Sequence, residues 1–403
     1  MNPKTYFQLS AMMFIEFFVW GAWYVTVGNY MTTVDMGQVV FWAYTVGPIG
    51  AIVSPFFLGM IADRFFSTEK VLGTLHIIGG IAMFCAPFVA YSAPLFIVLL
   101  LLHMLCYMPT IGLVNSLAFH NIGPQEKHFP IIRVFGTIGW IVANIVVSYV
   151  LNADKTAIPL YIAGGAGVFM GLYSFTLPHT PPPAAGEVVK VRQILGIDAL
   201  AQLKSREFIV FIVSSFLICI PLATYYTYAP IFVSDANIAN PAFKLSFGQM
   251  SEVIFMLAVP FFFARFGVKW ILLVGMFAWF LRYALFALAA PGVILWMIMF
   301  GIILHGLCYD FFFVAGQIYV DKKANPKIRA QAQGFLVLIT YGAGMLIGAQ
   351  VTGWIKNWLV PESGAAALNQ WPLFWALPAI FAGIIIIFFA LLFQEKLASK
   401  TTV

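Results

Sequence analysis

Three charged residues stand inside long apolar runs of this chain. Arg133 lies in FPIIRVFGTIGW, Glu252 in GQMSEVIFML and Asp310 in LHGLCYDFFFV. An ionisable group within a membrane is costly, so such groups are rare and usually line a polar cavity. The neighbouring side chains that can hydrogen-bond or stack are Thr137, Trp140, Gln249, His305 and Tyr309. This mixture of charges, hydrogen-bonding groups and aromatic faces predicts a binding site for a polar, flat solute.

The composition identifies the environment in which these residues must work. Hydrophobic residues make up 62% of the chain and charged residues 9%, whereas soluble domains carry about 25% charged residues. A spanning helix needs about 20 apolar residues, and about twelve such runs are present. We therefore predict an all-α polytopic membrane protein, embedded in a lipid bilayer, with twelve transmembrane helices. The predicted spans are 6–32, 38–61, 71–91, 94–120, 130–151, 158–177, 207–234, 245–266, 268–289, 293–320, 328–354 and 370–394.

The distribution of basic residues predicts the orientation. The formal net charge of +6 does not indicate nucleic-acid binding, because the positions of the basic residues follow the membrane topology. If the N-terminus is cytoplasmic, Arg133 and Arg282 lie within spans, and Lys155, Lys244 and Lys356 lie outside. Every other lysine and arginine then falls in a cytoplasmic segment. The positive-inside rule thus predicts that both termini are cytoplasmic and that the number of spans is even.

A basic link divides the chain into two parts of six spans each. Residues 178–206 open with a proline run that cannot continue a helix. We expect an N-terminal six-helix bundle at 1–177, a cytoplasmic linker at 178–206 and a C-terminal six-helix bundle at 207–403. Many secondary transporters share this two-bundle plan.

The cysteines do not suggest a metal site. All of them lie inside apolar runs without metal-ligand spacing. We therefore predict that the cysteines are small buried hydrophobic residues that form no disulfide and bind no metal. They are Cys85, Cys106, Cys219 and Cys308.

A polar stripe begins at Arg133. Helical spacing places Arg133, Thr137, Trp140 and Asn144 on one face. One interpretation is a cavity wall, in which arginine balances charge, threonine hydrogen-bonds and tryptophan stacks. In the other, Arg133 snorkels to the cytoplasmic interface and the remaining residues pack against neighbouring helices.

Gln249 and Glu252 lie three residues apart and therefore face the same way. The glutamine offers both a donor and an acceptor. Burial and a nearby arginine push the pKa of a glutamate in opposite directions, which suits a group that exchanges protons. The alternative is a structural ion pair between Glu252 and Arg282.

His305 and Tyr309 align on one helix, with Asp310 on the adjacent face. His305 is either a packing residue or, beside an intramembrane aspartate, part of the site. Tyr226 belongs to a tyrosine cluster in IPLATYYTYAPIF, whose members either anchor the helix at the membrane interface or face a cavity.

Glu16 is a further carboxylate within the first apolar run, ahead of VWGAWY. It is either a second proton-linked group or a residue near the membrane interface without a role. The run around it is expected to be a transmembrane helix, since no cleavage site of a signal peptide follows.

Several motifs carry a resemblance to known transporters. In GMIADRFFSTEK, residues Gly59, Asp63 and Arg64 resemble the cytoplasmic-loop motif of the major facilitator superfamily, with phenylalanines in place of its second glycine. Over almost the whole chain the sequence resembles the nucleoside–proton symporter family of that superfamily. The motifs are VWGAW, GMIADR, YMPTIGLVNS, FPIIRVFGTIGW, LGIDA, QMSE, AWFLRYALFA, YDFF and IRAQAQGF, in the family's order.

The resemblance implies a major facilitator fold and a set of substrate contacts. These are Arg133, Thr137, Trp140, Gln249, Glu252, His305, Tyr309 and Asp310, where Trp140 and Tyr309 replace a typical phenylalanine and His305 a typical tyrosine. Tyr226 stands in the seventh span, where the family's glutamine and asparagine contacts are missing. Glu16 stands where the family carries glutamine.

The expected function is proton-coupled nucleoside import by alternating access, with Asp310, Glu252 and Glu16 as proton-coupling residues. We expect a monomer in the bacterial inner membrane, with protons as coupling ions and no other cofactor. A proton-coupled sugar or glycoside symporter of the same fold remains an alternative. A polytopic membrane enzyme is less favoured, since no nucleophile–base pair or phosphate-binding loop is present.

Overall fold

The chain folds into long helices joined by short links. The computed structural model describes residues 2–57, 65–123, 125–182, 203–325 and 328–394, and these contain no strand. Helices suit a bilayer because they satisfy their backbone hydrogen bonds internally. The main helices are α1 (Pro3–Tyr24), α2 (Val27–Thr33), α3 (Val40–Phe57), α5 (Thr68–Cys85), α6 (Ala93–Asn121), α7 (Gln125–Asn144), α8 (Ile158–Ser174), α11 (Arg206–Asp235), α12 (Pro241–Ala289), α13 (Leu295–Tyr309), α14 (Ala315–Lys323), α15 (Arg329–Val337), α16 (Met345–Leu359) and α17 (Trp371–Leu392).

The described helices account for the predicted membrane spans. Ten helical segments are long and apolar enough to cross a membrane. One of them, α12, consists of two helices that meet at Gly267, where φ is 74° and ψ is 175°. Only glycine adopts this backbone conformation readily. Together with the shorter apolar helix α8, the described part of the chain thus holds twelve apolar helices, and the predicted fold class is confirmed.

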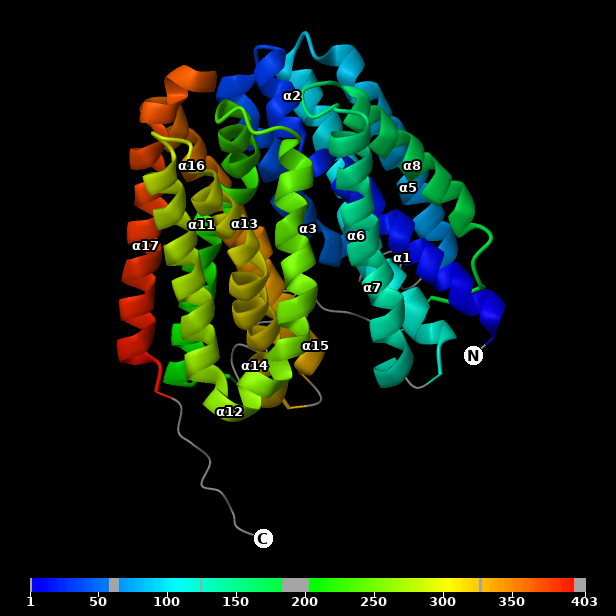
Figure 1. The fold of residues 1–403 in the computed structure, drawn as a ribbon. Helices are drawn as coiled ribbons and strands as arrows, with labels where there is room; N and C mark the ends of the chain where they lie inside the picture. The colour runs from blue at the N-terminus through cyan, green and yellow to red at the C-terminus, as the bar shows by residue number, and fades with distance from the viewer. Residues whose placement is uncertain (1, 58–64, 124, 183–202, 326–327, 395–403) are drawn as a thin grey trace, which may run out of the picture.

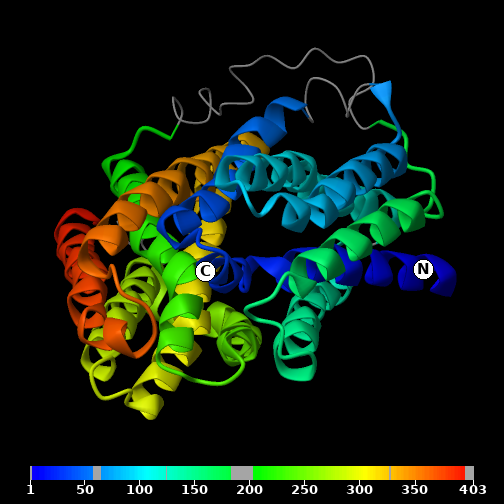
Figure 2. The same cartoon turned by 90° about the horizontal axis from the view of Figure 1, so that it is seen from above.

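The helices form two groups that stand side by side (Figure 1). Seen from above, α1 to α8 gather on one side and α11 to α17 on the other (Figure 2). We refer to them as the N-terminal half and the C-terminal half. Most of the predicted linker lies outside the described residues, and so do Gly59, Asp63 and Arg64 of the loop motif.

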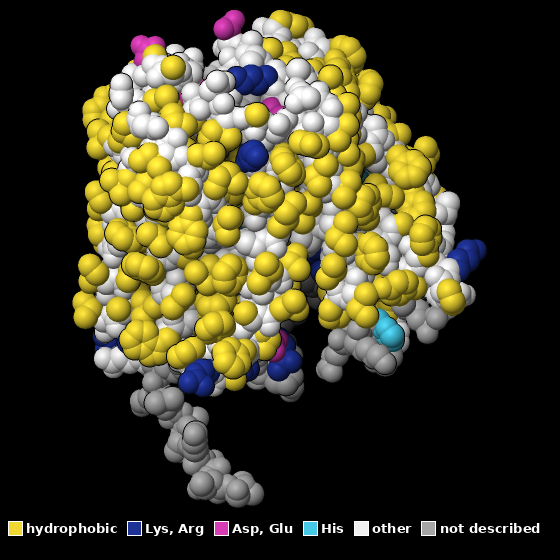
Figure 3. Space-filling view, viewed as in Figure 1, with side chains coloured by type: hydrophobic (Ala, Val, Ile, Leu, Met, Phe, Trp, Pro, Cys, Tyr) yellow, Lys and Arg dark blue, Asp and Glu magenta, His cyan; other side chains and the backbone are white. Residues whose placement is uncertain are grey.

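The outer surface is apolar around the middle of the molecule. Figure 3 shows hydrophobic side chains over most of one face, with charged side chains gathered towards its upper and lower edges. Large side chains such as Leu257 and Leu391 are 80% and 68% exposed. Contiguous apolar surface of this extent marks contact with another apolar phase, which here is the bilayer core.

Hydrogen bonds join the two halves at one end. Asp154, which follows α7, accepts a hydrogen bond of 2.9 Å from the backbone N of Ala242 at the start of α12. Asn240 Nδ2 donates to the carbonyl oxygen of Ser148 at 2.6 Å. The links that hold these residues lie at the top of Figure 1. At the opposite end, the lower edge of Figure 3 is hollowed between the halves.

Two glycines allow close contact between helices that carry predicted site residues. A Cβ at Gly306 on α13 would lie 2.5 Å from the backbone N of Glu252 on α12. A Cβ at Gly139 on α7 would overlap the carbonyl oxygen of Phe14 on α1. Small residues let membrane helices approach closely, and here they fix α12 against α13 and α1 against α7.

We expect Gly306→Ala to destabilise the protein by about 1–3 kcal/mol, the usual cost of overpacking, because its methyl group would collide with the α12 backbone. Thermal unfolding in detergent measures the effect. Gly165→Ala on α8 is the matched control, since a Cβ at that position would have nothing within 4 Å of it. Equal melting temperatures for the two variants would contradict the close packing of α12 and α13.

Candidate functional site

A cavity of about 450 Å³ lies between the two halves and takes its lining from both. The N-terminal half contributes residues of α1, α3, α6 and α7, and the C-terminal half contributes α11, α12, α13 and the segments around α15 and α16. Its volume falls within the range of about 300–1,000 Å³ usual for small-molecule sites. Of the nine residues predicted to bind substrate, all except Asp310 line this cavity.

Helix α7 forms one wall. Arg133, Thr137 and Trp140 line the cavity, as the cavity-wall interpretation requires. The Arg133 guanidinium lies 4.2 Å from the ring centroid of Phe17 on α1, which favours the cavity-wall interpretation over snorkelling. Asn144 completes the stripe but is fully buried, and its Nδ2 donates to the carbonyl oxygen of Trp140 at 2.9 Å.

The opposite wall comes from α11, α12 and α13. Gln249 and Glu252 lie on α12, and His305 and Tyr309 lie on α13. The close contact at Gly306 holds these two pairs together. Tyr226 on α11 also faces the cavity, and its hydroxyl lies 3.4 Å from His305 Nε2.

Arg282 supports this wall from behind and does not neutralise Glu252. Its Nε donates to the carbonyl oxygen of Gly301 at 2.9 Å, and its guanidinium lies 4.1 Å from the ring centroid of Tyr225. Tyr225 in turn stacks on His305, with ring centroids 5.4 Å apart. The alternative of a Glu252–Arg282 ion pair is therefore wrong for this conformation.

Opposite charges face each other across the cavity. Arg133 belongs to the N-terminal half and Glu252 to the C-terminal half, and the two interact electrostatically. Such attraction is stronger in a protein interior than in water, because the effective dielectric constant is lower. Tyr309 also interacts electrostatically with Arg133.

Asp310 lies next to the cavity and not on its surface. Its side chain is 0% exposed, and neither carboxylate oxygen has a hydrogen-bond partner among the described residues. A buried, unpaired carboxylate is very unfavourable in its ionised form, so this conformation suits a protonated Asp310. The residue opens a π-helical turn, η5 (Asp310–Val314), a distortion that occurs frequently at functional sites.

The sequence-based set lacks five aromatic residues of the cavity: Phe17, Trp20, Tyr24, Phe313 and Tyr341. Trp20 and Tyr24 on α1 line it together with Tyr341, which lies in the π-helical turn η6 (Leu338–Gly344). The Trp20 ring meets that of Trp140 edge to face at 5.5 Å, and that of Tyr341 at 6.2 Å. The four-residue spacing of Trp20 and Tyr24 in VWGAWY was the available signal. Tyr341 gave no such signal, since the residues that follow it in YGAGMLIGAQ are small or apolar.

Two glycines of the YGAGMLIGAQ segment allow close packing against α11. A Cβ at Gly344 or Gly348 would lie 2.7 Å from the Cβ atoms of Cys219 and Ala223 on α11. The cysteines are free, and Cys106, Cys219 and Cys308 are buried.

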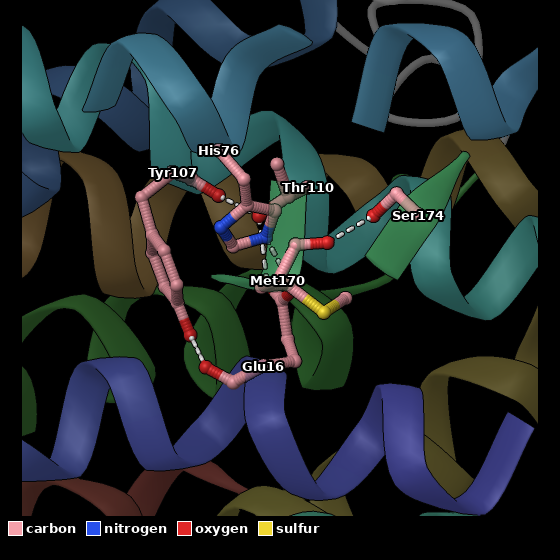
Figure 4. Close-up of polar contacts among 6 residues, drawn as sticks. All are labelled: Glu16, His76, Tyr107, Thr110, Met170 and Ser174. Carbon is pink, nitrogen blue, oxygen red and sulfur yellow. Dashed lines mark hydrogen bonds and ion pairs between the residues drawn. The ribbon is translucent and has the colours of Figure 1, made fainter. Parts of the chain in front are cut away.

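Glu16 lies outside the cavity, in the interior of the N-terminal half. Its side chain is 0% exposed, and Oε2 is 2.7 Å from His76 Nε2 on α5. Thr110 on α6 lies 2.6 Å from Oε1 (Figure 4). Glu16 is therefore enclosed among helices of the N-terminal half and does not face the outer surface.

Comparison with known proteins identifies the family. The family model described as "Nucleoside H+ symporter" matches residues 3–398. The chain belongs to the nucleoside–H+ symporter family. It is 39% identical to YegT of Escherichia coli (strain K12) over 98% of this chain and 95% of the relative. It is 32% identical to the nucleoside permease NupG of the same organism over 98% and 97%.

The fold agrees with this assignment. The crystal structure of nucleoside transporter NupG superposes with a TM-score of 0.86 at 29% identity, covering 98% of this chain and 100% of that one. The present chain is thus a multi-pass membrane transporter of nucleosides coupled to protons, and not an enzyme.

We expect Trp140→Ala to weaken nucleoside binding about 5- to 150-fold, since stacking of a base on an aromatic ring contributes roughly 1–3 kcal/mol. Binding of labelled nucleoside to detergent-solubilised protein measures the loss. Trp358→Ala is the control, because Trp358 is 80% exposed on the outer surface. Equal affinities of the two variants would remove Trp140 from the binding site.

Proposed function

We propose that this protein imports nucleosides with protons across the bacterial inner membrane, binding the nucleoside in the cavity between its halves. The observation that carries the proposal is the joint lining of that cavity by aromatic rings and opposite charges from both halves. Trp140 and Tyr309 offer flat faces to the base. Gln249 and Thr137 offer donors and acceptors to the base and the ribose.

Glu252 and Asp310 carry the proton linkage in this proposal. Glu252 faces the cavity, Asp310 is enclosed beside it, and the two carboxyl groups interact electrostatically. Repulsion between two carboxylates in a low-dielectric site favours at least one bound proton. Arg133 then balances the charge of Glu252 whenever that group is ionised. One proton that enters with a neutral solute contributes about 2.3 kcal/mol per 100 mV of membrane potential.

Transport proceeds by rocking of the two halves about the cavity. Hydrogen bonds such as that from the backbone N of Ala242 to Asp154 join the halves at one end of the molecule. The other end is hollowed between the halves (Figure 3). The links at the hollowed end include the α12 kink and the region around α14, where Arg265, Lys322 and Lys323 stand. By the positive-inside rule this end is cytoplasmic, so the described conformation opens inward and both termini are cytoplasmic.

We further propose that the transporter works as a monomer and that protons are its only coupling ions. Each half contributes part of the cavity wall within a single chain, so a second copy is not needed to complete the site. In this proposed mechanism the protein needs no metal, no organic cofactor and no nucleic-acid partner.

Asp310→Asn is expected to abolish uphill nucleoside uptake into proteoliposomes under an inward proton gradient, because asparagine cannot take up the coupling proton. Exchange of labelled for unlabelled nucleoside at equal pH should persist, since the cavity wall is unchanged. Together these two assays separate a loss of coupling from a loss of folding.

Asp35→Asn is the matched control for this substitution. Asp35 is exposed and has a φ of 57°, a conformation that asparagine also tolerates. Its uptake should equal that of the wild type. Full accumulation by Asp310→Asn would refute the role of Asp310 in proton coupling.

A further inference from the structure

The N-terminal half encloses a carboxylate–imidazole pair that the cavity does not include. Glu16 and His76 are 0% and 3% exposed, and their side chains meet at 2.7 Å. Neither residue lines the cavity between the halves. The pair joins α1 to α5, and Thr110 adds α6 (Figure 4). Ionisable residues inside a membrane protein are costly and usually mark a functional site.

Thr110 allows Glu16 to exist in two protonation states without losing a hydrogen bond. The Thr110 hydroxyl lies 2.6 Å from Glu16 Oε1 and 2.5 Å from the carbonyl oxygen of Tyr107. A hydroxyl has one hydrogen and can also accept. With Glu16 ionised, Thr110 donates to Oε1. With Glu16 protonated on Oε1, Thr110 turns its hydrogen to the Tyr107 carbonyl and accepts from the carboxylic acid.

The second oxygen of Glu16 keeps one hydrogen-bond donor in both states. With its hydrogen on Nε2, His76 donates to Oε2 at 2.7 Å in both states. Because a buried polar group without a partner is expensive, a site that satisfies both forms of a carboxyl group is suited to binding and releasing a proton.

We propose that Glu16, with His76 and Thr110 as partners, is a second proton-binding site, which loads one proton per transport cycle in addition to that of the Glu252–Asp310 pair. This inference rests on the proposed proton-coupled import. It assigns the transporter two protons per nucleoside, and it places the second one in the half opposite to Glu252 and Asp310.

The groups that surround the pair are consistent with this role. From α6, Tyr107 donates its hydroxyl hydrogen to the carbonyl oxygen of Glu16 at 2.8 Å. His103, also on α6, stacks on Tyr107 with centroids 5.7 Å apart. Its Nδ1 lies 2.9 Å from the carbonyl oxygen of Gly79 and therefore carries the hydrogen. Its buried Nε2 has no partner among the described residues.

The other neighbouring helices contribute one charge. On α7, the Arg133 guanidinium lies over Phe17, the residue after Glu16. On α8, Met170 lies towards the pair and its carbonyl oxygen accepts a hydrogen bond of 2.7 Å from Ser174 (Figure 4). Neither side chain titrates. Glu69, at the start of α5, is engaged with His179 and the backbone N of Thr180.

Helix α1 connects this site to the cavity. Phe17 and Trp20 lie on the cavity surface, one and four residues beyond Glu16. The Trp20 ring also lies 5.6 Å from that of Tyr107, whose hydroxyl group is bonded to Glu16. A shift of α1 on nucleoside binding or bundle rocking therefore changes the contacts of Glu16, which is sealed from solvent in this conformation.

The accumulation ratio at equilibrium counts the coupled protons. In proteoliposomes with a pH difference of one unit and the membrane potential clamped at zero, each coupled proton raises nucleoside accumulation about 10-fold, the equivalent of about 1.4 kcal/mol. The wild type should reach about 100-fold. Glu16→Gln, which preserves the size of the side chain and can bond to both partners, should reach about 10-fold.

Glu69→Gln is the control, because it alters another buried carboxylate bonded to a histidine in the same half, and it should keep the wild-type ratio. Nucleoside exchange at equal pH must persist in Glu16→Gln, which shows that the variant folds. Equal ratios for the wild type and Glu16→Gln would overturn the second site and leave the proposed function intact.

The accumulation ratio of the wild type tests the second proton-binding site even if Glu16→Gln does not fold. A wild-type ratio of about 10-fold would overturn the inference. No accumulation by the wild type would instead refute the proposed function, and the second site with it.

Discussion

The attraction between Arg133 and Glu252 across the cavity is the interaction on which the rest of the structure depends. Each charge belongs to a different half, so neither half alone can neutralise its own buried ion. In a low-dielectric interior an unpaired charge is severely unfavourable. The two halves must therefore meet at mid-membrane with matching polar faces. The aromatic residues around the pair line a space that a flat, hydrogen-bonding solute can fill.

Proton coupling follows from the same constraint. A nucleoside that binds between Arg133 and Glu252 competes with their attraction, and a proton on a carboxyl group removes a charge that would otherwise stand unpaired. Asp310, enclosed without a hydrogen-bond partner among the described residues, is suited to carrying that proton in this conformation. The pair of Glu16 and His76 repeats the principle in the other half, where a hydroxyl group that can donate or accept stabilises both protonation states.

The sequence predicted the fold class and much of the cavity wall for local reasons. Helical spacing alone aligned Arg133, Thr137 and Trp140, and a charge in an apolar run signalled a polar interior. Contacts between distant segments were beyond its reach. His76 lies 60 residues from Glu16, and no periodicity links them. Tyr341 faces the cavity from a π-helical turn, which regular helical spacing does not describe. Asp310 begins another such turn, and it lies behind the wall and not on it.

Measurement of the charge that enters with each nucleoside is the most direct test of proton-coupled transport by this protein. Wild-type proteoliposomes, adsorbed on a sensor that records charge movement, would be exposed to uridine and to adenosine at equal pH on both sides. We predict an inward positive current with at least one of the two, which disappears when a protonophore short-circuits the membrane. Nucleoside uptake without any accompanying charge would contradict proton-coupled transport by this protein.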